Sequence, residues 1–276
     1  GKGELILIFG NPGGGKSWTV IDIVAYAAVL GYNVVYYTLE LSEAYIGKRI
    51  DAFLTKVPMN ELVNNKEKIE DVIKKIKGRI RIKEFPAGKA SLNTIESHLD
   101  QLKNAEDFET DLIAIDYLDL LKNKTKGRKD RLEDSHDIFI DARGLAKERD
   151  VPIISPSQIG RSGAQDDIIQ ADKIAGSYQK VMISDFALSL SRKRKDKVNG
   201  TGRWHVMKNR NGPDGMTFGS KIDTSNGHIE IFDQPLDDDG EEQGEGTWNN
   251  APQGIGKDDK EFIKNFFKTP ELQVEE

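Results

Sequence analysis

The sequence has 276 residues, of which 37% are hydrophobic, and a formal net charge of −6 at pH 7. This length and apolar content can fill one large core, and no stretch reaches the ~18 consecutive apolar residues of a membrane helix. Cysteine is absent and the four histidines lie far apart, so disulfides, thiol catalysis and cysteine-based zinc sites are excluded. We expect a soluble protein, and this composition is compatible with a cytoplasmic location.

Strand-like and helical patterns alternate along the first 154 residues. Short runs rich in Val, Ile, Leu or Tyr predict strands at residues 5–9, 33–39, 79–85, 112–115 and 151–154. Helical periodicity fills the segments between them, at residues 16–30, 43–77, 91–103 and 132–149. This alternation is typical of parallel βαβ units, so we predict an α/β fold with a mostly parallel central sheet flanked by helices.

Further strand-like runs follow at closer spacing, at residues 186–190, 202–207, 216–222 and 228–232. Their spacing predicts antiparallel strands at the C-terminal end of the sheet. Residues 1–232 are therefore expected to form one folded domain.

The charge of the chain is concentrated after residue 232. From Asp233 onward there are 13 acidic and 4 basic residues, a net charge of −9, which leaves +3 for residues 1–232. Residues 233–256 are poor in apolar side chains, which predicts a flexible acidic linker. In residues 257–276, apolar side chains recur at helical spacing and predict a short amphipathic segment; they are Phe262, Ile263, Phe266 and Phe267.

The clearest motif is a glycine-rich loop between a predicted strand and a predicted helix. It matches the phosphate-binding pattern G-x-x-x-x-G-K-[ST] with Gly10, Asn11, Pro12, Gly13, Gly14, Gly15, Lys16 and Ser17. The glycines let backbone N–H groups converge on phosphate oxygens, Lys16 reaches the terminal phosphates and the Ser17 hydroxyl ligates Mg²⁺. The motif predicts ATP and Mg²⁺ as cofactors. A plain glycine turn is the alternative, and no G-x-G-x-x-G register supports a dinucleotide site.

Three polar side chains after predicted strands complete the expected site. Asp116 follows the run 112–115, where a P-loop enzyme has its second Mg²⁺ anchor. Glu40 follows the strand 33–39, which we predict to lie next to the P-loop strand, and its carboxylate could activate water at the γ-phosphate. Gln158 could sense the same phosphate. Taken alone, Asp116 could be a turn residue, and Glu40 and Gln158 ordinary solvated side chains.

These motifs resemble, in order, those of the DnaB-like replicative helicases within the RecA-like ATPases. The resemblance covers residues 3–232 and rests on the P-loop, Thr38-Leu39-Glu40-Leu41-Ser42 with Arg49 following, Asp116-Tyr117-Leu118, Val151-Pro152, Ser157-Gln158-Ile159-Gly160-Arg161, and Lys208-Asn209-Arg210-Asn211-Gly212-Pro213-Asp214-Gly215. It implies a RecA-like core with Glu40 as the water-activating base and Gln158 as the γ-phosphate sensor. It also makes Arg210, with Lys208 beside it, the finger that enters a neighbouring subunit's ATP site.

The sequence departs from the family pattern at Asp119, where members often have Gln, at Pro156, and along residues 56–90. No segment matches the family's N-terminal domain and linker helix, so we expect a hexameric ring to need upstream residues. The resemblance implies an ATP-dependent DNA helicase that translocates on single-stranded DNA, in the cytoplasm of a bacterial or phage-infected cell. The acidic tail is expected to bind a replication partner.

A basic run follows the Asp116 segment. It has six bases within ten residues, namely Lys122, Lys124, Lys126, Arg128, Lys129 and Arg131. Because this loop faces the central channel in RecA-like assemblies, we predict that it tracks DNA phosphates without reading sequence. A solvated basic loop is the alternative. The cluster at residues 192–195 is either a second DNA contact or a charged hairpin end.

Two other functions are compatible with this sequence. A RecA-type recombinase or a clock-type ATPase would share the fold and the P-loop, although the Asn-Gly-Pro turn and the Thr-Leu-Glu-Leu-Ser segment favour a helicase. A non-motor subunit would bind ATP mainly to assemble with partners. DNA-stimulated ATP turnover distinguishes such a subunit from a motor or a recombinase.

Overall fold

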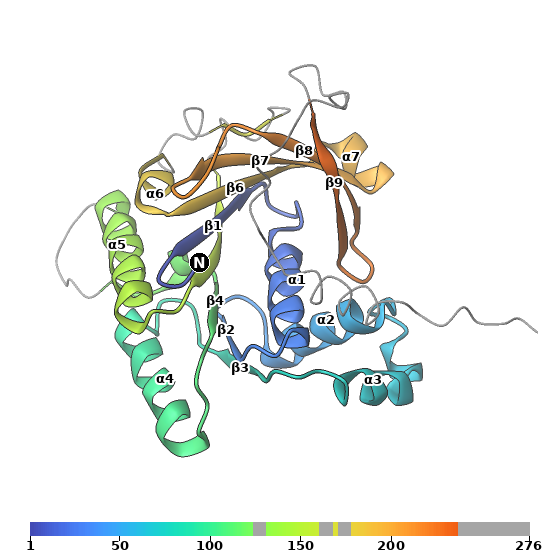
Figure 1. Cartoon of the computed structure of the whole chain (residues 1–276), viewed down its shortest axis with the longest axis horizontal. Helices are drawn as coiled ribbons and strands as arrows, with labels where there is room; N and C mark the ends of the chain where they lie inside the picture. Colours follow the sequence, from blue (N-terminus) through green and yellow to red (C-terminus); the bar gives the residue numbers. More distant parts are fainter. Residues whose placement is uncertain (124–130, 160–167, 171–177, 237–276) are drawn as a thin grey trace, which may run out of the picture.

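The computed structural model describes residues 1–123, 131–159, 168–170 and 178–236, with only the backbone described at 131–135 and 233–234. These residues form one nine-stranded sheet of order β3-β2-β4-β5-β1-β6-β7-β8-β9 (Figure 1). The strands are β1(Leu5–Gly10), β2(Val34–Thr38), β3(Ile80–Glu84), β4(Leu112–Asp116), β5(Ile153–Gln158), β6(Phe186–Ser191), β7(Thr201–Asn209), β8(Thr217–Asp223) and β9(His228–Leu236).

Helices cover both faces of the parallel part of the sheet (Figure 1). They are α1(Lys16–Val29), α2(Glu43–Thr55), α3(Lys66–Ile73), α4(Leu92–Glu106), α5(Arg131–Arg149), α6(Tyr178–Ile183) and α7(Arg194–Asn199), with the short 3₁₀ helices η1(Leu62–Asn64) and η2(Leu118–Leu120). Ser42 and Ser91 cap α2 and α4, because their hydroxyls accept backbone N–H bonds from Tyr45 (3.3 Å) and Thr94 (3.4 Å).

The sheet separates two hydrophobic cores. Successive strand residues point to opposite faces, so Val35 and Tyr37 of β2 pack in the core that contains α4 and α5. Val34 and Tyr36 pack in the core that contains α1 and α2. Every residue of β2 is buried, as expected for a strand that is covered on both faces.

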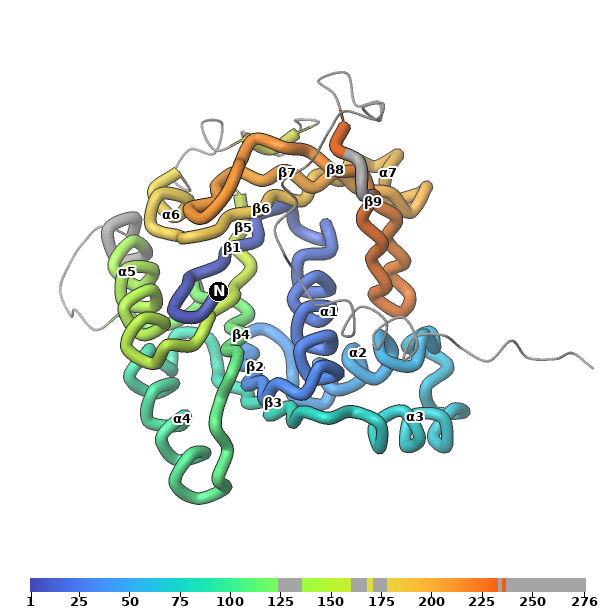
Figure 2. The backbone as a smooth tube through the Cα atoms, viewed as in Figure 1, coloured from blue at the N-terminus to red at the C-terminus, as the bar shows by residue number. Residues whose placement is uncertain are grey.

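The strand directions confirm the predicted α/β fold. Strands β1 to β6 pair in parallel, and β7, β8 and β9 extend the sheet in antiparallel fashion. Strand β9 runs to Leu236, past residue 232 where the folded domain was predicted to end, and residues 237–276 lie outside the described part. Figure 2 shows the β8–β9 turn near α2, and in the loop that follows α2 the Met59 N–H donates to the Ser225 carbonyl (3.1 Å).

One expectation about the sheet is wrong. Strand β2 does not lie next to β1, because β4 and β5 stand between them. The local pattern of a strand carries no information about which parallel neighbour it pairs with, since strands covered on both faces, such as β1, β2 and β4, all read as short and mostly apolar runs. Among the described residues, no helix has the length and apolar character needed to cross a membrane.

A buried carboxyl group lies in the helix that follows the P-loop. Asp22 belongs to α1, and its Oδ1 atom is buried with no hydrogen-bond partner in the described part of the chain. Burial raises the pKa of Asp22 from 3.8 to about 8. The folded protein therefore binds this proton more tightly than the unfolded chain does, and Asp22 lowers stability progressively as the pH rises from about 4 to about 8.

Replacing Asp22 with asparagine should remove this loss of stability. We expect Asp22→Asn to raise the free energy of unfolding at pH 8 by on the order of 3 kcal/mol and to change it little at pH 4. Urea denaturation of both proteins across this pH range measures the difference. Asp71→Asn, which removes a carboxylate that is 68% exposed, is the matched control. Parallel stability curves for wild type and Asp22→Asn would contradict the interpretation.

Candidate nucleotide site

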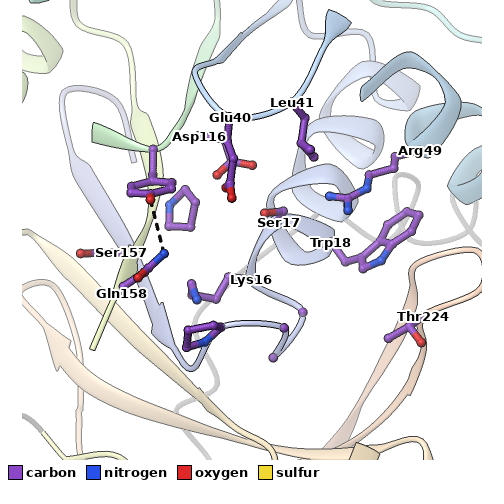
Figure 3. A pocket seen from close by; sticks show the side chains of 16 residues that line it. Lys16, Ser17, Trp18, Glu40, Leu41, Arg49, Asp116, Ser157, Gln158 and Thr224 are labelled. Carbon is purple, nitrogen blue, oxygen red and sulfur yellow. Dashed lines mark hydrogen bonds between the residues drawn. The ribbon is translucent and has the colours of Figure 1, made fainter. Parts of the chain in front are cut away.

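The glycine-rich loop joins β1 to α1 and lines a pocket of about 420 Å³ (Figure 3). Gly13 and Gly15 have φ angles of +64° and +108°, left-handed conformations that glycine adopts without a steric penalty. A Cβ on Gly14 would lie 2.9 Å from the Asn11 carbonyl oxygen, so no side chain fits there. The loop's N–H groups and the start of α1 form a cradle of the kind that binds phosphate.

Lys16 begins α1, and its ammonium folds back over the loop. Nζ donates to the carbonyl oxygens of Gly10 (2.8 Å) and Asn11 (3.0 Å). Burial lowers the pKa of Lys16 to about 8, while the nearby carboxylates of Asp116 and Glu40 favour its charged form. The charge lies in a partly desolvated site, where its attraction to phosphate is stronger than in open water.

Asp116 ends β4 beside the P-loop, and its carboxyl group is buried. The Tyr36 hydroxyl donates to Oδ2 (2.9 Å). Burial raises the pKa of Asp116, and the hydroxyls of Tyr36 and Ser17 partly offset that rise. The Ser17 hydroxyl lies near this carboxylate, yet the Oδ1 atom of Asp116 accepts no hydrogen bond of good geometry from the described residues. This oxygen and the Ser17 hydroxyl are hard ligands, so the residues present fit an Mg²⁺ ion shared with phosphate oxygens.

Strand registers bring Glu40 and Gln158 to the same pocket. Parallel pairing sets Thr38 beside Asp116 and Gly10 beside Gln158. Glu40, two residues past Thr38, is exposed, and Figure 3 shows its side chain pointing into the pocket toward Ser17. An open carboxylate in this position can orient a water molecule and accept its proton.

Side chains connect the ends of β4 and β5, which pair through two residue positions only. The Gln158 amide donates to the Tyr117 hydroxyl (3.3 Å; Figure 3). The Ser157 hydroxyl donates to Asp119 Oδ2 (3.1 Å), and Lys180 of α6 forms an ion pair with Asp119 Oδ1. Asp119 departs from the family pattern, and here it fixes the end of the strand that carries Gln158.

The pocket wall includes three residues to which the sequence motifs assigned no role: Trp18, Arg49 and Thr224. The Arg49 guanidinium lies over the rings of Trp18 (5.1 Å) and Tyr45 (5.0 Å), and within the described residues its buried Nε has no hydrogen-bond partner. Tyr45 and Arg49 are four residues apart, so helical spacing could have indicated their shared face. No sequence pattern places Thr224 here, because the β8–β9 turn meets α1 only in the folded chain.

Arg210 and Lys208 lie away from this pocket. The Arg210 N–H donates to the Asp185 carbonyl (3.0 Å), and its half-exposed guanidinium lies 3.4 Å from Asp185 Oδ1. Asp185 also accepts the Leu5 N–H (3.1 Å) at the start of β1, roughly 17 Å from the P-loop at ~3.3 Å per residue. Lys208 donates to the Val181 carbonyl (3.1 Å), and burial lowers its pKa. Neither side chain lines the pocket of its own chain.

The family model of the DnaB-like helicase C terminal domain matches residues 1–220. The chain belongs to this family. The family inferred from the sequence motifs is thereby confirmed.

Individual relatives agree with this assignment. The DnaB-like domain described here is 28% identical over 200 residues to the DnaB-like replicative helicase of Enterobacteria phage T4, which covers 68% of this chain and 42% of the phage protein. A solved DnaB-like replicative helicase, studied with its interactions with primase, shares the fold (TM-score 0.71, 21% identity, 83% of this chain and 57% of that chain). A second solved structure, of an ATPase domain, shares it equally (TM-score 0.71, 21% identity, 84% of this chain and 86% of that chain). The chain thus spans less than half of the phage relative.

The candidate DNA-binding run of this DnaB-like domain is described only at its ends. Lys122 is exposed, and Arg131 is the first residue of α5. Outside the described residues lie Lys124, Lys126, Arg128 and Lys129. In the cluster at 192–195, Arg192 is buried and its Nε donates to the Thr201 carbonyl (2.8 Å). Arg192 is therefore a structural residue of the hairpin, while the other three side chains are exposed.

Proposed function

We propose that this chain is the ATP-hydrolysing motor domain of a ring-forming replicative DNA helicase, which translocates on single-stranded DNA and unwinds duplex DNA. The supporting observation is that the site is divided. The P-loop, Asp116, Glu40 and Gln158 share one pocket, whereas Arg210 lies at the other end of β1. A half-exposed arginine there is available to a neighbouring subunit's pocket, so hydrolysis would require assembly.

Each residue then has a chemical role. The P-loop N–H groups and Lys16 would bind the ATP phosphates, and Ser17 and Asp116 would hold Mg²⁺. When bound, Mg²⁺ would neutralise part of the phosphate charge. Glu40 orients the attacking water and accepts its proton, and Gln158 contacts the γ-phosphate. Arg210 and Lys208 of the neighbouring subunit would stabilise the charge that develops on the transferred phosphoryl group.

The proposed partners follow from charge and from the relatives. Single-stranded DNA would contact the basic run 122–131 through its phosphates, because this run has no aromatic residue for base stacking. Other copies of the chain would complete a hexamer. The acidic tail would bind a replication partner, and primase is one such protein, since the solved DnaB-like helicase is described together with its interactions with primase. The chain would act in the cytoplasm of a bacterial or phage-infected cell, in keeping with its similarity to a replicative helicase of Enterobacteria phage T4.

ATP turnover with and without single-stranded DNA tests this function. We expect DNA to raise turnover severalfold in assembled rings, because translocation couples the two activities. The same protein should separate a forked DNA duplex. If saturating DNA left ATP turnover unchanged, a non-motor assembly subunit would be favoured. If DNA stimulated turnover without strand separation, a recombinase would be favoured.

A further inference from the structure

A short helix, α7, carries a basic side chain to the P-loop. Strand β6 pairs in parallel with β1, so the chain that leaves β6 begins beside the loop. Lys197 Nζ lies 3.7 Å from the position that a Cβ on Gly13 would occupy, and the Arg192 NH1 atom lies 3.8 Å from the corresponding position on Gly15. Two cations therefore flank the glycine-rich loop in addition to Lys16.

The backbone of α7 is held in place by a buried carboxylate. Asp196 accepts the Lys193 N–H (2.8 Å) and the Thr201 hydroxyl (3.3 Å), and it lies 3.4 Å from both terminal nitrogens of Arg203. These contacts join the start of α7 to β7. The flexible stem of Lys197 thus extends from a fixed point beside the glycine-rich loop.

The positive charge of Lys197 has no counter-anion among the described residues. Its side chain is exposed, and no carboxylate in that part of the chain forms an ion pair with it. Burial is the main cause of the lowered pKa of Lys16, and the positive charge of Lys197 adds to it. Like charges thus face a loop of backbone N–H donors. A bound polyphosphate would offset the repulsion between these positive charges. The Lys197 ammonium sits on a flexible four-carbon stem, so it can move to contact the phosphate oxygens.

We propose that Lys197 is a second phosphate-binding lysine, which contacts the terminal phosphates of ATP in the same subunit as the P-loop. This inference rests on the proposed ATP site. It adds to that site a positive charge, the Lys197 ammonium, that belongs to the same subunit. Arg210 would reach the phosphates only across a subunit interface. Lys197 should therefore contribute to nucleotide binding even when the chain is a monomer.

Calorimetric titration of the 276-residue chain with Mg²⁺ and the non-hydrolysable analogue AMP-PNP tests the contact. We expect Lys197→Met to weaken binding about tenfold, the scale of one hydrogen bond to a charged group. Lys197→Arg should restore most of the affinity. Lys195→Met is the matched control, because it removes an equally exposed positive charge from the same helix, and it should change affinity less than about twofold.

Thermal unfolding without nucleotide separates binding from folding. Removing one of several like charges should leave the Tm of Lys197→Met unchanged or raise it, while the stabilisation by AMP-PNP becomes smaller. Equal affinity in wild type and Lys197→Met would overturn the inference but leave the proposed ATP site intact. Equal weakening by Lys195→Met, or a lower Tm without nucleotide, would also overturn it. Absence of binding by the wild-type chain would overturn the ATP site itself.

Discussion

Replacing Arg210 with alanine should lower ATP turnover in assembled rings by roughly 10³-fold and leave ATP affinity nearly unchanged, on the scale of arginine fingers. The reason is the distance between Arg210 and the ATP site of its own chain. The Arg210 guanidinium lies beside Asp185 near the start of β1, whereas the phosphate-binding loop follows the end of β1. The charge can therefore act on a neighbouring subunit's phosphates during the reaction. Steady-state turnover and nucleotide titration on the same rings measure the two quantities.

Mixed rings give the sharper test of this arrangement. Arg210→Ala retains an intact P-loop and Lys16→Ala retains an intact finger, so adjacent subunits of the two kinds should recover part of the turnover. Each variant alone should stay inactive at every concentration. No recovery in rings shown to contain both variants would mean that Arg210 acts in its own subunit or not at all. A large loss of ATP affinity would indicate that its contact with Asp185 is structural instead.

Replacing Glu40 with glutamine should lower turnover by roughly 10²- to 10⁴-fold while ATP still binds. Glutamine keeps the size of the side chain and its contact with water but cannot accept the proton. Glu43→Gln is the matched control, since Glu43 lies three residues away and its carboxylate accepts the Glu84 N–H (2.8 Å) outside the pocket. Turnover should be nearly normal in that variant.

Lys16→Ala separates binding from chemistry. Removing the buried ammonium should abolish tight ATP binding, because the cradle then lacks its central charge. Turnover and affinity should fall together in Lys16→Ala, whereas only turnover should fall in Glu40→Gln. Wild-type turnover in Glu40→Gln would show that another group activates the water.

The sequence predicted best what depends on residues close together in the chain. The P-loop is one uninterrupted motif, and its context of strand and helix is confirmed by β1 and α1, whose predicted bounds differ from the observed ones by one residue. The buried strands were also found, because each is a short apolar run bounded by turn residues. The short helices α6 and α7 were missed, since six residues are too few to show a helical period.

By itself, the sequence determined the fold class, the P-loop and the family, since local periodicity and contiguous motifs encode them. Only the tertiary structure decided which strands are neighbours. The insertion of β4 and β5 between β1 and β2 sets Gln158 opposite Gly10 and Asp116 opposite Thr38. On the other edge of β1, the pairing with β6 brings Lys197 to the P-loop and leaves Arg210 at the opposite end of β1. Strand order depends on packing between segments far apart in sequence, and buried strands of similar composition cannot specify it locally.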